Sequence, residues 1–370
     1  MNVAPLIIPI FLPNVGCRDR CLFCNQKASA EGLPSPSSVR NFIEASLAGI
    51  PNKKENREKQ VAFYGGSFTA IHKDDQARYL EEVQPFLFSG LINSIRISTR
   101  PDALGEEILC LLKEYGVKTI ELGTQSMIDE VLILANRGHC VGDTVSAVSQ
   151  LREWGFKVGL QLMIGLPGDS LARFLQTLDR VIGLRPDFVR IHPTLVLKGA
   201  PLETLWRTGR YLPLSLEEAI QWLKVGFIKL ERSSIPLARI GLQPTRELER
   251  DFLAGPFHPA LHQLIDSEIF LDMATSLLEG FDDGFEPVFF CHVTQISNMR
   301  GQKNRNIMRL REKLQLKDIS IQGREDIPRG LLTLQTQKGN ISIQREELRY
   351  LERRIEGQER LLNYNTQASI

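Results

Sequence analysis

Three cysteines, Cys17, Cys21 and Cys24, stand close together near the start of the chain. Their spacing, Cys-x3-Cys-x2-Cys, lets three thiolates converge on one inorganic centre. A structural zinc ion normally takes four protein ligands, so a zinc loop would need a distant histidine or one of Cys110, Cys140 and Cys291. A four-iron, four-sulfur cluster held by three cysteines leaves one iron open to a small molecule. The spacing favours the cluster, and the zinc loop remains the alternative.

Two further groups of residues follow expected strands and could hold a ligand. Gly65 and Gly66 come after the apolar run 61–64, and glycines let the backbone approach a ligand closely. Gln125 follows the run 118–123, and Arg137 lies twelve residues beyond it. A guanidinium is suited to a carboxylate, which it can bind through two hydrogen bonds. The alternatives are a plain turn at the glycines and a surface ion pair at the arginine.

The cysteine motif, with Phe23 just before its last cysteine, resembles the signature of the radical S-adenosylmethionine (radical SAM) enzymes. The resemblance implies a [4Fe–4S] cluster on Cys17, Cys21 and Cys24, whose open iron chelates S-adenosylmethionine (SAM). It also implies a reducing electron donor. One electron then cleaves a carbon–sulfur bond of SAM, and the 5′-deoxyadenosyl radical abstracts a hydrogen atom from a substrate.

The pattern Gly-x-Gln-Ser…Asn-Arg-Gly-His, from Gly123 to His139, resembles the radical SAM domain of the Elongator complex catalytic subunit. It resembles the oxygen-independent coproporphyrinogen III oxidases more distantly. Carried over by position, Gln125 would contact the ribose of SAM and Arg137 its carboxylate, while Gly65, Gly66 and Ser67 would hold its amino group. Ser98 and Gln161 stand where the oxidases carry acids, and they could still hydrogen-bond the ligand. The cofactor-binding candidates are therefore Phe23, Gly65, Gly66, Ser67, Ser98, Gln125, Arg137 and Gln161; no catalytic residue is assigned.

These residues need a scaffold that brings them together, and the chain alternates short apolar strands with helices. Strands are expected at 6–13, 61–64, 94–99, 118–123, 157–163 and 188–196. Such alternation predicts an α/β fold with a parallel sheet, and the resemblance implies the radical SAM partial (βα)6 barrel. Functional loops of such folds follow the carboxyl ends of the strands, as the candidate residues do. We expect the core barrel over 1–230 and a smaller α+β extension over 231–370, with a basic helix and a hairpin.

The composition is that of an ordinary globular protein, and a net charge of +1 says little about partners. Few, clustered cysteines favour a reducing compartment, so we expect a cytoplasmic protein. The apolar run before the cysteines is short and interrupted by prolines, which argues against a membrane partner. His192, His258 and His292 are expected to be structural.

A run of cations near the C-terminus could bind phosphates, as in RNA, or could form a solvated helix face. It comprises Arg300, Lys303, Arg305, Arg309, Arg311, Lys313 and Lys317. The leading hypothesis is a radical SAM enzyme similar to the Elongator subunit, without its acetyltransferase, with RNA or tRNA as the candidate substrate. The alternatives are a tetrapyrrole-type radical SAM oxidoreductase and a non-enzymatic iron–sulfur or zinc protein that binds RNA or another partner.

Overall fold

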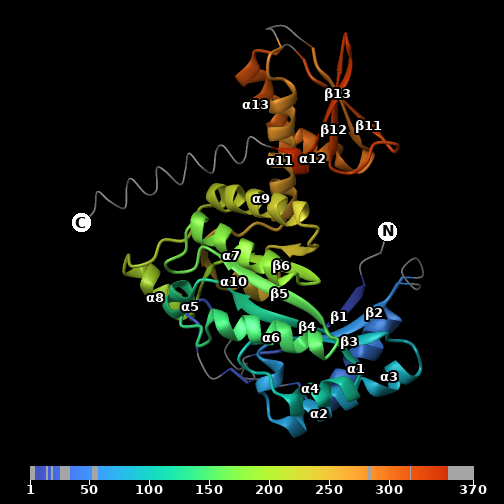
Figure 1. Cartoon of the computed structure of the whole chain (residues 1–370), viewed down its shortest axis with the longest axis vertical. Coiled ribbons are helices and arrows are strands. Elements are labelled where there is room, and N and C mark those ends of the chain that lie inside the picture. The colour runs from blue at the N-terminus through green and yellow to red at the C-terminus, as the bar shows by residue number, and fades with distance from the viewer. Residues whose placement is uncertain are drawn as a thin grey trace.

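A curved sheet of seven parallel strands, together with the helices that cover it, forms the larger part of the molecule (Figure 1). The computed structural model describes residues 5–13, 16–17, 20–25, 34–51, 57–281, 286–316 and 318–348. The strands lie in the order β1-β2-β3-β4-β5-β6-β8, so neighbours in sequence are neighbours in the sheet. They are β1 (Leu6–Leu12), β2 (Lys59–Gly65), β3 (Ser94–Thr99), β4 (Val117–Gln125), β5 (Lys157–Ile164), β6 (Phe188–Pro193) and β8 (Leu237–Ile240).

The helices between the strands cover one face of this sheet. On β6 the residues Val189 and Ile191 are fully buried and share a core with Phe174 and Leu223 of the helices α7 and α9. Successive side chains of a strand point to opposite faces, so the residues between them face the inside of the curve. The helices are α1 (Pro36–Ala48), α2 (Lys73–Glu81), α3 (Gln84–Phe88), α4 (Glu106–Glu114), α5 (Asp129–Leu134), α6 (Val141–Glu153), α7 (Leu171–Leu184), α8 (Pro201–Arg207), α9 (Leu216–Arg232) and α10 (Arg246–Asp251).

The α/β fold and the six expected strands are confirmed, with two differences in detail. The last expected strand, 188–196, ends at Pro193, and the separate β7 (Val196–Leu197) pairs with β9 (Phe252–Ala254) in a two-stranded sheet. A seventh strand, β8, pairs with β6 in parallel and lies beyond residue 230. The division of the chain at residue 230 stays a prediction, and the sheet itself continues to Ile240.

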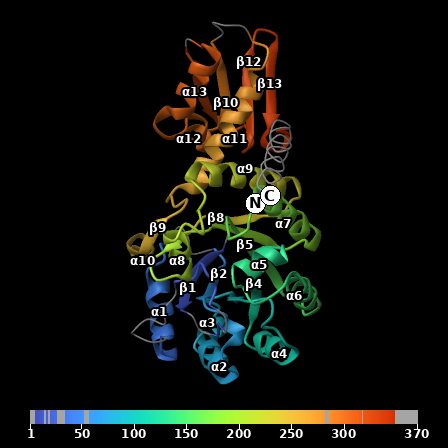
Figure 2. The ribbon, with the colours of Figure 1, turned by 90° about the vertical axis from the view of Figure 1, so that its left-hand side faces the viewer.

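The C-terminal part is smaller and stands beyond α9 (Figures 1 and 2). Its four-stranded sheet has the order β11-β10-β12-β13, with β10 (Val288–His292) and β11 (Ser320–Arg324) parallel. The expected hairpin is present as β12 (Leu331–Thr336) and β13 (Gly339–Gln344). The helices here are α11 (Leu261–Leu277), α12 (Ile296–Arg300) and α13 (Arg305–Leu314).

The expected basic helix is divided between α12 and α13. The backbone leaves helical geometry between them, where Gly301, Lys303 and Asn304 all have positive φ. Of the seven cations in the run, Lys317 lies outside the described residues. The six others are exposed. Among the described helices, none is long and apolar enough to cross a bilayer.

Candidate active site

The cysteine loop follows the carboxyl end of β1 and is held by backbone contacts with distant elements. Leu22 donates its N–H to the carbonyl of Ala135, at 3.0 Å, and accepts from the N–H of Leu202, at 2.8 Å. The Asn136 side chain donates to the carbonyl of Arg20, at 2.8 Å. The chain after α5 and the start of α8 therefore fix this loop from two sides.

Cys17 is exposed, Cys21 buried and Cys24 half-buried, and none of the three forms a disulfide. Burial first, and the neighbouring Cys21 second, raise the pKa of the Cys17 thiol. Within the described ranges, no three Cys, His, Asp or Glu side chains already stand together in the geometry of a metal site. The assignment of the cysteines as cluster ligands stays a prediction.

The turn after β2 packs directly against the cysteine loop. Gly66 donates its N–H to the carbonyl of Leu12 at 2.7 Å. Gly65 has φ +111°, and a Cβ there would lie 2.6 Å from that carbonyl oxygen. Gly16 has φ +72°, and a Cβ there would lie 2.4 Å from the carbonyl oxygen of Ser67. Only glycine allows both close approaches, so the loop and the turn form one backbone cradle.

Ser67 links this cradle to the end of β3. Its hydroxyl lies 2.9 Å from that of Thr99 and accepts the N–H of Arg100 at 3.1 Å. The side chain is 1% exposed. The Ser67 hydroxyl is thus bonded within the protein, and a contact between this turn and a ligand would come from the backbone. Gly66 and Ser98 line one small pocket together with Leu12, Phe63, Tyr64, Phe68 and Ile71.

Arg137 and Gln125 meet beside Cys21. Arg137 donates to the Cys21 sulfur at 3.2 Å and to the carbonyl of Gly123 at 2.6 Å. Its Nε is buried and makes no hydrogen bond to the described residues, and the same holds for Oε1 of Gln125. A Cβ on Gly123 would lie 2.7 Å from Arg137 and 3.1 Å from the Gln125 amide. The two side chains assigned to SAM therefore lie together, with polar atoms still available.

Gln125 also has an unusual backbone. It ends β4 with φ 64°, in the left-handed region that costs a non-glycine residue about 1–2 kcal/mol. The register between β4 and β5 shifts just before it. Such strain is often found at functional sites, and here the strained residue has its amide beside Gly123, next to the Arg137 guanidinium.

Phe23 and Gln161 contribute differently. Phe23 packs on two small apolar clusters, one containing Met163 and one containing Leu202 and Tyr211. Gln161 is half-buried on β5, in register with Arg190 of β6. It lies on the inner face of the sheet, below the cysteine loop. The structure thus gathers the glycines, Ser67, Gln125 and Arg137 around the cysteines and sets Gln161 deeper inside.

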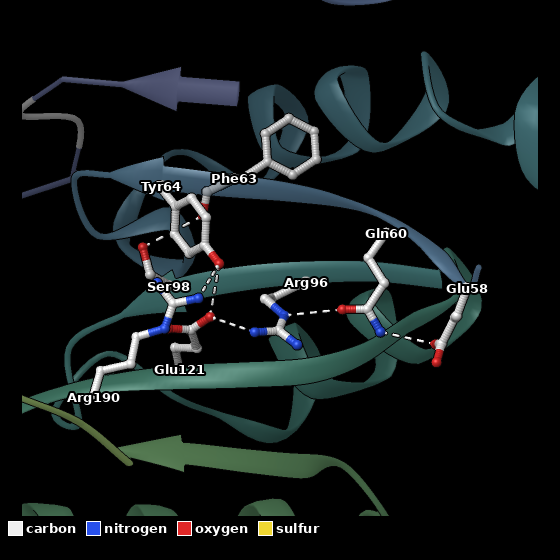
Figure 3. Close-up of polar contacts among 8 residues, drawn as sticks. All are labelled: Glu58, Gln60, Phe63, Tyr64, Arg96, Ser98, Glu121 and Arg190. Carbon is white, nitrogen blue, oxygen red and sulfur yellow. Dashed lines mark hydrogen bonds and ion pairs between the residues drawn. The ribbon is translucent and has the colours of Figure 1, made fainter. Parts of the chain in front are cut away.

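Sequence reasoning missed a charged network on the inner face (Figure 3). Glu121 of β4 binds Arg96 of β3 at 2.9 Å and Arg190 of β6 at 3.0 Å, and Tyr64 donates to it at 2.8 Å. Burial first, and the Glu121 charge second, raise the pKa of Tyr64 to about 12. The available signal was a charged residue in the middle of two neighbouring apolar strands, "SIRIST" and "TIELG".

The network ends at the amino end of the sheet. Arg96 donates to Gln60 at 3.1 Å, and Gln60 in turn donates to Glu58 at 2.9 Å. The Arg96 guanidinium lies 5.0 Å from the ring centre of Phe188, and Phe188 fills the space over Gly159. The inner face is therefore closed by polar and aromatic groups at one end, and the candidate ligand residues lie at the other.

Comparison with known proteins agrees with this arrangement. The family described as the radical SAM superfamily matches residues 11–181, and the radical SAM C-terminal domain matches residues 186–270. A tRNA uridine(34) acetyltransferase of Methanocaldococcus jannaschii is 32% identical over 204 residues, which are 54% of this chain and 38% of that protein. Protein YhcC of Escherichia coli K12 is 31% identical over 210 residues, which are 54% of this chain and 64% of that protein.

A solved structure supports the fold. The archaeal Methanocaldococcus infernus Elp3 superposes with a TM-score of 0.56 at 24% sequence identity, over 72% of this chain and 63% of that one. The chain spans under two fifths of the M. jannaschii relative. The two family matches cover the end of β1, the other six strands of the sheet and the loops that carry the candidate residues. On these matches, the chain is an enzyme of the radical SAM superfamily.

Proposed function

We propose that this enzyme cleaves SAM reductively at a [4Fe–4S] cluster held by Cys17, Cys21 and Cys24. The observation that carries the proposal is Arg137, a buried arginine that donates to the Cys21 sulfur and keeps its Nε without a partner in the described residues. A guanidinium there can stabilise thiolate charge and still bind a carboxylate. When bound, the cluster and SAM would supply a radical that abstracts hydrogen.

The residues around the cysteines fit this pair of groups. Three cysteines outside any disulfide stand in the loop, and the glycine cradle brings backbone groups beside them. Arg137 would bind the SAM carboxylate, the Gly65-Gly66 backbone its amino group, and the unpartnered Gln125 Oε1 a ribose hydroxyl. Burial first, and the Arg137 charge second, lower the pKa of His139 to about 4, so this histidine stays neutral and adds no charge to the site.

We propose RNA, and tRNA first, as the substrate. Two relatives are named for action on tRNA uridine 34, and the exposed cations around α13 offer a surface for phosphates. The chain covers only 38% of those relatives. The proposal therefore comprises only the radical chemistry on RNA.

The test is anaerobic reconstitution with iron and sulfide, followed by dithionite and SAM. We expect 5′-deoxyadenosine as product and a reduced-cluster spin-resonance signal. The triple variant Cys17→Ala/Cys21→Ala/Cys24→Ala should lose the iron, the brown colour and the product. The matched control, Cys110→Ala/Cys140→Ala, removes two exposed thiols outside the loop. It should keep the iron, the brown colour and the product. Full iron content in the triple variant would contradict the assignment.

A further inference from the structure

The inner face of the sheet carries more positive than negative charge. Arg96 and Arg190 share one carboxylate, that of Glu121. A third guanidinium, that of Arg239, comes from β8. Glu58 reaches this group of residues only through the side chain of Gln60. Three guanidiniums therefore come from this face, and only two of them are paired with its carboxylate.

Among these three arginines, Arg239 is the one that has no acidic partner in the described residues. It donates to the carbonyl of Gly241 at 3.1 Å and to the side chain of Gln243 at 2.9 Å. Both acceptors are neutral. Arg239 is also the register partner of Arg190 across the parallel pair β6–β8, so the two side chains stand next to each other on one face. Burial first, and the charge of Arg190 second, lower the pKa of Arg239.

His192 adds a polar atom just above this pair. It lies two residues after Arg190 on β6, which is about 7 Å along a strand. Its Nε2 is buried and makes no hydrogen bond to the described residues. Burial first, and the charges of Arg190 and Arg239 next, lower the pKa of His192 to about 3. At neutral pH the ring is uncharged and can donate one hydrogen bond.

The position of these residues relates them to the cysteine loop. His192 is in register with Met163 of β5, and Met163 packs in the cluster that contains Phe23 of the loop. Arg190 and Arg239 therefore lie one inward-facing position farther from the cysteine loop than His192, level with Gln161. A molecule held there by one end could direct its other end toward the cysteines.

We infer that Arg190 and Arg239, with His192 above them, form a binding site for an oxyanion, a carboxylate or a phosphate group, of the molecule that reacts in the barrel. Arg190 directs its Nε to Glu121 and one terminal nitrogen to the Tyr64 hydroxyl, and Arg239 uses two nitrogens on its neutral acceptors. An anion would therefore pair with the remaining terminal nitrogen of each guanidinium through charge-assisted hydrogen bonds. An anion between the two arginines would also reduce their mutual repulsion. Glu121 is paired with Arg190 and leaves the charge of Arg239 without a carboxylate partner. The inference goes beyond the proposed function, because it concerns anion binding and does not require SAM cleavage.

The test is calorimetric titration of the full-length reconstituted protein with inorganic phosphate and, separately, with succinate, at constant ionic strength. Arg239→Gln should weaken binding of the preferred anion by about ten- to a hundred-fold. Arg239→Lys should recover part of the affinity, since an ammonium keeps the charge but not the paired geometry. The control is Arg246→Gln, which removes an exposed arginine of α10 and should bind as the unaltered protein does.

Each outcome has a defined meaning. Binding of phosphate alone would assign the site to a phosphate group, and binding of succinate alone to a carboxylate. Binding of neither anion, or equal losses in Arg239→Gln and Arg246→Gln, would overturn the inference. Because the readout is binding, the inference can fail while SAM cleavage is observed, and it can succeed when SAM cleavage is not.

Discussion

At the scale of single residues, the contact between Arg137 and Cys21 joins two segments that are far apart in sequence. The motif analysis assigned Arg137 to a ligand carboxylate, and the fold brings its guanidinium to 3.2 Å from the Cys21 sulfur. That distance depends on Gly123, whose missing Cβ leaves room for the guanidinium. A resemblance can propose the role of a residue, but only the folded chain provides such a contact.

We predict that Arg137→Ala and Gln125→Ala weaken SAM binding while the iron content stays unchanged. A hydrogen bond to a charged group contributes about 1.5–3 kcal/mol and a neutral one about 0.5–1.5 kcal/mol. Arg137→Ala should therefore cost roughly ten- to a hundred-fold in affinity and Gln125→Ala up to about tenfold. Calorimetry under nitrogen measures both. Arg78→Ala, which alters an exposed arginine of α2, is the control, and unchanged affinity in both site variants would refute the assigned roles.

His192 provides a prediction about pH. Burial and two nearby guanidiniums lower its pKa in the folded protein to about 3, from an ordinary value of 6.5. Between pH 6.5 and about pH 3, the unfolded chain therefore binds a proton at this histidine that the folded protein does not bind. The stability from this group is complete above pH 6.5 and is lost as the pH falls toward 3. The total is on the order of a few kcal/mol.

Urea unfolding at a series of pH values tests this. His192→Gln should show a smaller loss of stability between pH 6.5 and pH 4 than the unaltered protein does. His72→Gln, at the surface, should leave the pH dependence as it is. If His192→Gln has the same acid dependence as the unaltered protein, the histidine is already charged or solvated in the fold.

At the scale of elements, the apolar pattern predicts six strands of the sheet and marks the segment that contains β8 only as a possible further strand. β8 is four residues long, "LARI"; it contains the charged Arg239, and only Ile240 is buried. Its place in the sheet comes from pairing with β6 and not from its own pattern. The inner-face network was missed for a related reason. Alternation of polar and apolar residues looks the same whether the polar face meets solvent or the interior of a barrel.

The helices α9 and α11 join the barrel to the C-terminal part through a buried ion pair. Lys224 of α9 donates to Asp272 of α11 at 2.5 Å, and their side chains are 0% and 9% exposed. Removal of one partner leaves a buried charge without compensation, which typically costs 3–5 kcal/mol. Replacement of both by apolar residues of similar size is often neutral or stabilising.

We predict that Lys224→Met and Asp272→Leu each lower the free energy of unfolding by about 3–5 kcal/mol. The double variant should recover most of that loss. Urea denaturation of the four proteins gives the coupling energy directly. If both single variants lose less than about 1 kcal/mol of unfolding free energy, water reaches the ion pair. The pair then does not hold the two helices together.

At the scale of the whole molecule, the cations around α13 and the barrel belong to different parts of the chain (Figures 1 and 2). A substrate that touches both must be large, which fits a nucleic acid better than a small tetrapyrrole. Arg309 is paired with Glu268. Arg300, Lys303, Arg305, Arg311 and Lys313 are exposed and have no acidic partner among the described residues. With a net charge of only +1, any attraction for RNA must be local.

We predict that this surface binds RNA and that Arg305→Glu/Arg311→Glu weakens the binding. Each neutralised phosphate of a single strand contributes about 0.7 to the slope of log affinity against log salt, so the double variant should lower that slope by about 1.4. Fluorescence anisotropy with tRNA at several salt concentrations measures it. The control, Arg329→Glu/Lys338→Glu, changes net charge equally at two other exposed positions of the C-terminal part and should keep the slope. Absence of RNA binding at low salt would exclude this surface as an RNA site and favour a small substrate held inside the barrel.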